Sequence, residues 1–269
     1  MPFVRLNGVK IHYEIYSPDK PGTPIVLLHG LGSCGDDWLL QVPAFSTCHR
    51  VLTLDLRGHG QSEKPRRPYA IGDLASDVAG LLDHIEAETA HVVGFSHGGT
   101  VALQLALDHP DRVGSLVLVN TFARYRPANL RSVIRLLRRL AFLLAGRMEL
   151  VGTEVAAGLF PGPDQAAQRK ATIQRISRDD RRAYLLAIRA LSRHDLRPRL
   201  GQITAPTLVI LGDRDMTVSP RAGEELARRI PGARLTVIPD SGHATPIDQP
   251  EQFNQAVLAF VDSLRDDAS

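Results

Sequence analysis

Cysteine is scarce in this chain, which has only Cys34 and Cys48 among its 269 residues. Neither lies at the spacing from a second cysteine or a histidine that metal sites require, and two cysteines are too few for a disulfide framework. We interpret both as free thiols in a reducing compartment. A chain of this length can form its core without a disulfide or a metal ion, and we expect neither.

Long apolar runs and a large net charge are also absent from the sequence. No run approaches about 18 apolar residues, the length that spans a membrane, and the N-terminus lacks the basic and then apolar pattern of a signal peptide. We therefore expect a cytoplasmic protein with no stable membrane anchor. The formal net charge of +3 is too small to indicate nucleic acid as a partner, and no pattern indicates an oligomeric state.

What the chain does contain is a series of short apolar runs that indicate buried strands. They are four to six residues long and nearly continuous in Val, Ile and Leu, which is typical of parallel strands with helices on both faces. Ahead of them, residues 3–6 and 9–16 flank Asn7-Gly8, a dipeptide suited to a two-residue hairpin turn. The apolar runs lie at residues 25–29, 51–55, 91–94, 115–120, 207–211 and 234–238.

Helical patterns alternate with these strands, at residues 71–86, 97–108, 220–230 and 249–264. The second ends before His109-Pro110, and the third begins at Ser219-Pro220, a good N-cap followed by a good first-turn residue. This alternation predicts an α/β fold with a doubly wound, mostly parallel sheet of about eight strands.

Residues 122–198 break the alternation, because they contain helical patterns but no strand candidate. We expect a helical insertion late in the sheet, with residues 1–121 and 199–269 forming the core. The insertion carries 15 Arg and 1 Lys against 6 acidic residues, a net charge of +10, which leaves −7 on the remainder.

The strongest local motif is Gly94-Phe95-Ser96-His97-Gly98-Gly99, which follows an apolar strand and opens a helix. A serine hydroxyl is a poor nucleophile unless it is exposed, positioned and paired with a base. A tight strand-to-helix turn flanked by glycines exposes the serine, and the helix points its N–H groups at the site. We therefore interpret Ser96 as a nucleophile.

A nucleophilic serine requires a base, and His243 is the candidate among ten histidines. It follows the last strand candidate directly, and Gly242 allows its loop to approach the site closely. For His59, His84, His109 and His194, in loops or on polar helix faces, we expect solvated positions.

The base in turn requires a carboxylate that orients it. Asp213 and Asp215 both follow the strand at residues 207–211, at the edge of the sheet where ligands bind. The distance from the strand end favours Asp215, because Asp213 is close enough to cap the turn. Both remain candidates on spacing alone.

The negative charge that develops on a carbonyl oxygen needs hydrogen-bond donors. The backbone N–H of His97, directly after the nucleophile, is one candidate. The glycine-rich turn His29-Gly30-Leu31-Gly32 follows an earlier strand and offers a second N–H group, from Leu31. We interpret the His29 side chain as a structural hydrogen-bonding group.

With these motifs in place, the chain resembles the α/β-hydrolase superfamily. The matching segments are residues 29–32, 55–62, 94–99, 212–215 with Val218 and Pro220, and 242–243, in the order of that family. The resemblance implies that the acid is Asp215, three residues after Gly212. It also implies that residues 122–198 form a helical cap and that residues 55–62 form a structural loop bordering the site.

The resemblance further implies a serine hydrolase that acts on a small-molecule ester or lactone through an acyl-enzyme and needs no metal or other cofactor. The pattern at residues 6–13, with Asn120-Thr121 entering the cap, is similar to 3-oxoadipate enol-lactonases and small esterases. A serine at position 96 differs from the aspartate of haloalkane dehalogenases. Carbon–carbon hydrolases, haloperoxidases or perhydrolases, and slow-turnover receptors on this scaffold remain alternatives, although Gly32 stands where haloperoxidases usually have proline.

The basic charge of the insertion has three interpretations. It could attract an anionic substrate, contact an anionic membrane surface or an acidic partner, or form an arginine-rich solvated surface. In residues 131–141 we expect one apolar helix face, formed by Val133, Ile134, Leu136, Leu137, Leu140 and Ala141, with the arginines elsewhere on the helix.

Overall fold

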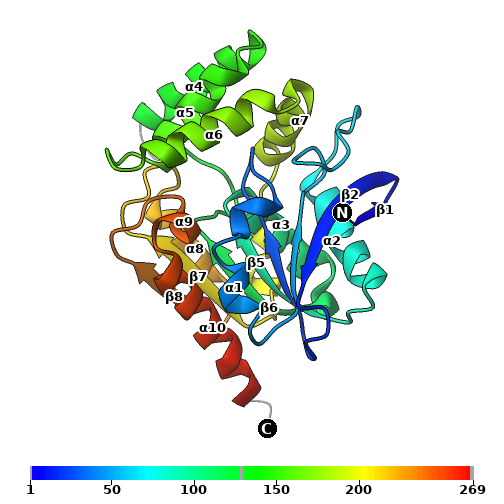
Figure 1. Cartoon of the computed structure of the whole chain (residues 1–269). Helices are drawn as coiled ribbons and strands as arrows, with labels where there is room; N and C mark the ends of the chain where they lie inside the picture. Colours follow the sequence, from blue (N-terminus) through cyan, green and yellow to red (C-terminus); the bar gives the residue numbers. More distant parts are fainter. Residues whose placement is uncertain (1, 128–129, 267–269) are drawn as a thin grey trace.

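The computed structural model describes residues 2–127 and 130–266, and its centre is one eight-stranded sheet. The strand order is β1-β2-β4-β3-β5-β6-β7-β8. Only the β1–β2 and β2–β4 pairs are antiparallel. The predicted mostly parallel sheet is therefore confirmed (Figure 1). The strands are β1 (Phe3–Leu6), β2 (Val9–Tyr16), β3 (Ile25–Leu28), β4 (Val51–Leu54), β5 (Ala90–Phe95), β6 (Val113–Val119), β7 (Thr207–Gly212) and β8 (Arg234–Ile238).

The chain begins with the predicted hairpin. Asn7 and Gly8 have φ angles of 47° and 80°, the left-handed conformation that a two-residue turn between twisted strands requires. The turn pairs Leu6 with Val9 in register. β2 then pairs with β4 and attaches the hairpin to the edge of the parallel sheet.

Helices cover both faces of the sheet, which is why its strands are apolar on both sides. One core cluster joins the sheet to α2 (Ile71–His84), α3 (His97–Asp108) and α8 (Pro220–Arg229). The second joins it to α1 (Val42–Phe45) and α10 (Pro250–Asp266). Between β8 and α10 lies the short helix α9 (Thr245–Asp248), and three short 3-10 helices span Gly35–Trp38, Pro110–Arg112 and Arg197–Gln202.

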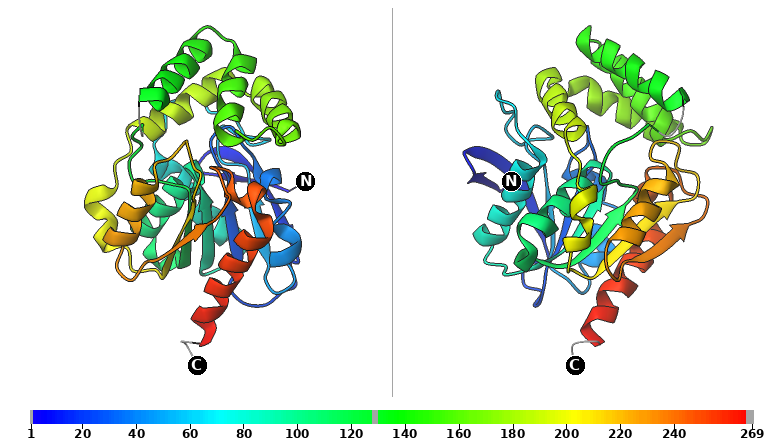
Figure 2. Two further views of the ribbon diagram at one scale, coloured as in Figure 1. Left: turned by 90° about the vertical axis from the view of Figure 1, so that its left-hand side faces the viewer. Right: turned by 180° about the vertical axis from the view of Figure 1, so that it is seen from behind.

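The predicted helical insertion lies between β6 and β7 and consists of four helices. Figures 1 and 2 show them together at one end of the molecule, beyond the sheet. They share a small core of their own, which includes Leu143, Val151 and Tyr184. The helices are α4 (Leu130–Leu144), α5 (Met148–Leu159), α6 (Ala166–Arg178) and α7 (Arg181–Ser192).

The single apolar face expected for residues 131–141 is wrong. Ile134 and Leu137 are exposed, whereas Leu136 and Leu140 line an internal cavity together with an arginine of the same helix, Arg139. Part of the apolar surface of α4 therefore faces outward. Among the described residues, no helix is long and apolar enough to cross a membrane.

Candidate active site

Ser96 occupies a strained turn between β5 and α3. Its φ and ψ angles are 51° and −112°, a conformation rarely adopted by residues other than glycine. The turn has this form because Ser96 is the single residue between the end of β5 at Phe95 and the start of α3 at His97. The carbonyl of Ser96 is held by the hydroxyl of Thr121 at 2.6 Å, so the end of β6 supports the turn.

Gly94 and Gly98, on either side of Ser96, lie too close to neighbouring backbone to carry a side chain. A Cβ atom at Gly94 would lie 2.6 Å from the carbonyl oxygen of Gly98. A Cβ atom at Gly98 would lie 2.1 Å from the carbonyl oxygen of Leu28, at the end of β3. Both distances are far inside van der Waals contact, so only glycine allows β3, β5 and α3 to approach in this way.

His243 lies against Ser96. Its Nε2 atom is 3.0 Å from the Oγ of Ser96, and its Nδ1 atom is 2.7 Å from the Oδ2 of Asp215. Because an ionised carboxylate can only accept, the Nδ1–H donates to Asp215 and leaves Nε2 as the acceptor for the serine hydroxyl. His243 is 2% exposed, so the base itself lies below the surface.

The two aspartates after β7 have different partners. Asp215 uses Oδ1 to accept the backbone N–H groups of Thr217 at 2.7 Å and Val218 at 2.9 Å, which orients its other oxygen toward His243. The carboxylate of Asp213 accepts the backbone N–H of Ser241 at 3.1 Å. Asp215 is therefore the aspartate that the fold brings to the histidine, and Asp213 ties the end of β7 to the loop after β8.

Asn120 supports this geometry, and sequence reasoning did not assign it to the site. Its amide nitrogen donates to the carbonyl of His243 at 2.6 Å and to the hydroxyl of Thr245 at 2.7 Å. Its amide oxygen accepts the N–H of Gly212 at 2.9 Å. One buried side chain thus connects the ends of β6 and β7 to the loop of the histidine. A polar residue directly after a buried strand is the signal that could have found it.

Several other histidines are buried beside the site. The expectation of solvated positions is wrong for His59 and His194, which are 3% and 7% exposed. The His97 ring is fully buried, and burial, with smaller contributions from His29 and His194, lowers its pKa to about 3. His29 is a structural group as expected, because its ring bonds the carbonyl of Gly30 and the N–H of Leu56. All four lie below the surface, and the His59 ring contacts those of His29 and His97, with centroids 5.1 Å and 5.9 Å away.

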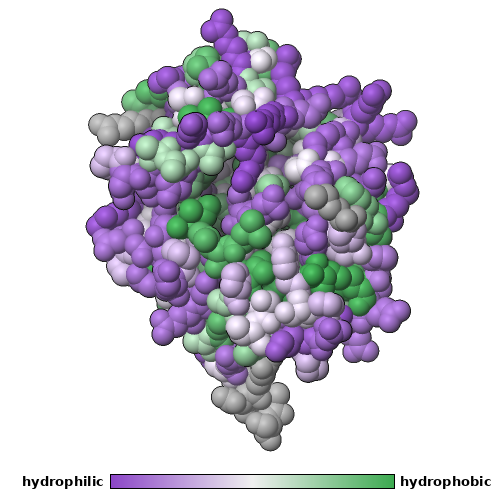
Figure 3. Space-filling model, in the orientation of Figure 1, coloured by the Kyte–Doolittle hydropathy of each residue, from purple (hydrophilic) through white to green (hydrophobic). Residues whose placement is uncertain are grey.

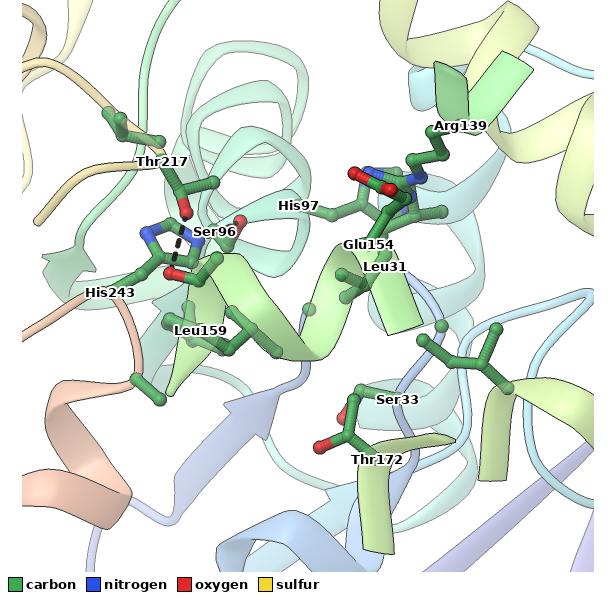
Figure 4. A pocket seen from close by; sticks show the side chains of 18 of the residues that line it. Leu31, Ser33, Ser96, His97, Arg139, Glu154, Leu159, Thr172, Thr217 and His243 are labelled. Atoms are coloured by element: carbon green, nitrogen blue, oxygen red, sulfur yellow. Dashed lines mark hydrogen bonds between the residues drawn. The ribbon is translucent and has the colours of Figure 1, made fainter. Parts of the chain in front are cut away.

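Ser96 and His243 open into a cavity of about 530 Å³ between the core and the insertion. Leu31 and His97, the candidate oxyanion donors, also line it. Figure 4 shows Ser96 and His243 pointing toward each other, while Arg139 and Glu154 lie on the opposite side of the cavity. Most of the lining is apolar.

The charged groups on the cavity wall are mostly paired. Arg175 of α6 forms an ion pair with Asp37, and Arg139 of α4 donates to the hydroxyl of Tyr184 and lies 5.1 Å from the centre of its ring. Glu154 pairs with Arg138 at 2.7 Å. These contacts give Arg139, Glu154 and Arg175 partners on the wall of a largely apolar cavity.

Comparison with known proteins decides the family. Residues 23–250 match the family model described as the alpha/beta hydrolase fold. The chain is an α/β-hydrolase. The resemblance drawn from the motifs is thereby confirmed, and so is the fold class, with its helical insert after β6.

Relatives of this α/β-hydrolase carry several activities in their names. It is 35% identical over 262 residues to RutD of Variovorax paradoxus (strain S110), which carries the name of a carbamate hydrolase; the match covers 93% of this chain and 96% of that protein. It is 34% identical over 248 residues to the dihydrolipoyllysine-residue acetyltransferase component of an acetoin cleaving system from Pseudomonas putida. That match covers 89% of this chain, which spans only 64% of the longer protein.

Among solved structures, the enol-lactonase from Burkholderia xenovorans LB400 superimposes with a TM-score of 0.89 at 32% identity. The superposition covers 97% of this chain and 100% of the enol-lactonase. The similarity therefore extends through both the sheet and the helical insert.

Proposed function

We propose that this α/β-hydrolase is a serine hydrolase that cleaves a carboxylic ester or a lactone. The observation that carries the proposal is the hydrogen-bonded series from Ser96 through His243 to Asp215, open to a largely apolar cavity. A nucleophile, a base and an orienting carboxylate in this order are the requirements of acyl transfer.

In the proposed reaction, the Oγ of Ser96 attacks the substrate carbonyl while Nε2 of His243 takes its proton. Asp215 holds the Nδ1–H and stabilises the imidazolium that forms. His243 then returns the proton to the leaving alkoxide, and the acyl group stays on Ser96. Water, deprotonated by the same histidine, releases the acid and restores the serine.

We propose that the oxyanion accepts hydrogen bonds from the backbone N–H groups of Leu31 and His97. His97 is the first residue of α3, so its N–H has no partner within the helix and points along the positive end of the helix dipole. Leu31 belongs to the turn after β3, which packs next to the nucleophile turn through Gly98. Each donor of this kind contributes about 10²–10³ to the rate.

We further propose that residues 122–198 act as a cap domain on a core formed by residues 1–121 and 199–269. Cavity-lining residues from both parts support this assignment, among them Phe95 and His243 of the core and Leu136, Leu159 and Ile188 of the insert. The cap would exclude water from the acyl-enzyme and determine the size of the substrate. The enol-lactonase likeness favours an ester or lactone.

Steady-state hydrolysis of p-nitrophenyl esters from acetate to octanoate tests this proposal. Ser96→Ala should lower kcat by on the order of 10⁶. Ser192→Ala is the matched control, because Ser192 also lines the cavity but its hydroxyl donates to the backbone carbonyl of Arg189 in its own helix. Equal rates in the wild type and in Ser96→Ala would refute Ser96 as the nucleophile. A stoichiometric burst without turnover would indicate a slow-turnover receptor.

A carbamate is the second candidate substrate, because RutD of Variovorax paradoxus carries that activity in its name. The same serine would then form a carbamoyl-enzyme, whose nitrogen makes the carbonyl less reactive toward water. Comparing kcat/KM for p-nitrophenyl acetate and p-nitrophenyl N-methylcarbamate separates the two. A higher value for the carbamate would replace the ester assignment.

A further inference from the structure

The outer side of α4 carries a continuous row of exposed apolar side chains. Leu130 is 73% exposed, Ile134 48%, Leu137 59% and Leu144 59%. Ala141 is also exposed, and the spacings of three and four residues place all five on one helix face. We call these five residues the outer stripe. Most other large exposed apolar residues of the described chain occur singly or in pairs, so this row is distinctive.

The outer stripe lies at the extreme end of the molecule. α4 is on the side of the insert that faces away from the sheet in each view (Figures 1 and 2). Its 15 residues make a helix about 22 Å long. In the space-filling view, apolar patches interrupt the hydrophilic surface at this end (Figure 3). The stripe can therefore meet a flat surface without interference from the core.

Basic side chains accompany the outer stripe. Arg126 precedes α4 and Arg147 follows it, and both are exposed. Arg138, on α4 itself, keeps 60% of its side chain exposed while it pairs with Glu154. At the C-terminal end, Nη1 of the exposed Arg181 lies 3.4 Å from the position of a Cβ at Gly146. The whole insertion has a net charge of +10.

We propose that the outer stripe docks this protein on the surface of an anionic phospholipid bilayer. A helix with leucines on one face and arginines around them lies in the plane of such an interface, with the leucines among the acyl chains and the arginines at the headgroups. The stripe supplies the apolar contact and the arginines supply the electrostatic attraction. The contact is peripheral and reversible, and it does not depend on the proposed reaction at Ser96.

The charge of the insertion argues against the alternative occupants of the stripe. A symmetric dimer through the stripe would bring a second segment of charge +10 against the first, and the two would repel. A folded acidic protein would ordinarily be held by aromatic or arginine anchors. The stripe itself consists of three leucines, an isoleucine and an alanine, and leucine is under-represented among such anchors. An anionic lipid surface satisfies both the charge and the aliphatic composition.

The inner side of α4 gives such docking a consequence for the site. Leu136 and Arg139 of the same helix line the cavity above Ser96. Binding through the outer stripe therefore places one wall of the cavity directly behind the lipid contact. An apolar ester dissolved in the bilayer would meet the protein on the side where the cavity lies.

Co-sedimentation of the full chain with sucrose-loaded vesicles tests this inference. We expect binding to vesicles of phosphatidylglycerol and phosphatidylcholine, weaker binding to pure phosphatidylcholine, and a decrease as salt is raised. Leu137→Gln should weaken the partition coefficient about tenfold, and Leu137→Gln combined with Leu144→Gln about a hundredfold, because each removes a partly exposed leucine from the apolar contact.

The matched control is Leu235→Gln on β8, which makes the same change at a leucine that is 43% exposed and far from the insert. Leu137 and Leu144 do not line the cavity, so hydrolysis of a short soluble ester should be unchanged in all variants. Absence of vesicle binding by the wild type, or equal binding by the double variant and the Leu235→Gln control, would overturn the proposal. So would a dimer in sedimentation velocity that the double variant abolishes while vesicle binding is absent.

Discussion

Replacing Asp215 by asparagine is expected to abolish nearly all activity while leaving the fold intact. The substitution preserves size and shape. The Oδ1 position accepts two backbone N–H groups, from Thr217 and Val218. Only an oxygen can serve both, so the asparagine amide must place its oxygen there. Its NH2 group then faces Nδ1 of His243, where the wild type has a carboxylate oxygen at 2.7 Å.

This exchange reverses the role of the histidine. Two donors cannot share a hydrogen bond, so Nδ1 must become the acceptor and the ring proton moves to Nε2. Nε2 then donates to Ser96 and cannot take its proton. A loss of base function through the wrong tautomer costs about 10⁴ in kcat in serine proteases, which corresponds to about 5.5 kcal/mol of barrier.

The assay is kcat/KM for p-nitrophenyl butyrate, with thermal unfolding followed by circular dichroism as the check on the fold. Asp213→Asn is the matched control. Asp213 accepts one backbone N–H, from Ser241, and an asparagine oxygen can still accept it. We expect Asp213→Asn to retain activity within about tenfold of the wild type, or about 1.4 kcal/mol.

Equal losses in the two variants would refute the reasoning, because both aspartates would then act through the loop and not through the histidine. A full loss of activity in Asp213→Asn with an active Asp215→Asn would mean that Asp213, and not Asp215, orients the histidine. Either result would also require a different account of how His243 is oriented.

Three further predictions follow from single contacts. Asn120→Ala removes buried hydrogen bonds to two loops, and urea denaturation should show a loss of about 2–4 kcal/mol, together with lower kcat. Gly98→Ala should lose more than about 3 kcal/mol of unfolding free energy or fail to fold, because its Cβ would lie 2.1 Å from the carbonyl oxygen of Leu28. Gly201→Ala is the control, because the space around that position is open and the variant should fold normally. Comparable stability of the two variants would contradict this prediction. Burial lowers the pKa of His194 to about 4, whereas in the unfolded chain it lies near 6.5. The stability that the neutral ring contributes is therefore complete above about pH 6.5 and is lost as the pH falls from 6.5 toward 4. His194→Gln should reduce the slope of unfolding free energy against pH by up to about 1.4 kcal/mol per unit within that window, and an unchanged slope would show that the ring is solvated.

The elements of the fold could be predicted from the sequence because their signals are local. The strands from β3 to β8 are nearly continuous apolar runs, and Asn7-Gly8 specifies a hairpin without reference to any distant residue. The turn around Ser96 is also local, since the glycines, the strand and the helix lie within a short stretch of chain. For these features, residue type and spacing were sufficient.

Other features depend on which distant segments pack together. Asp213 and Asp215 have almost the same local surroundings. They differ because the ring of His243, 28 residues beyond Asp215, bonds only Asp215, whereas Asp213 bonds the backbone of Ser241 in the same loop. His59 and His194 are buried by elements remote in sequence, and Asn120 acquires its role from a loop more than 120 residues away.

α4 shows the same limit on a larger scale. Periodicity located the helix, but only the packing of the insert decided which side of it faces the cavity and which side faces outward. The sequence by itself determined the strands, the helices and the turn around Ser96, because hydrophobic period and backbone sterics act over a few residues. The tertiary structure decided the carboxylate, the buried histidines and the outer stripe, because burial and hydrogen-bond distance depend on contacts between segments far apart in the chain.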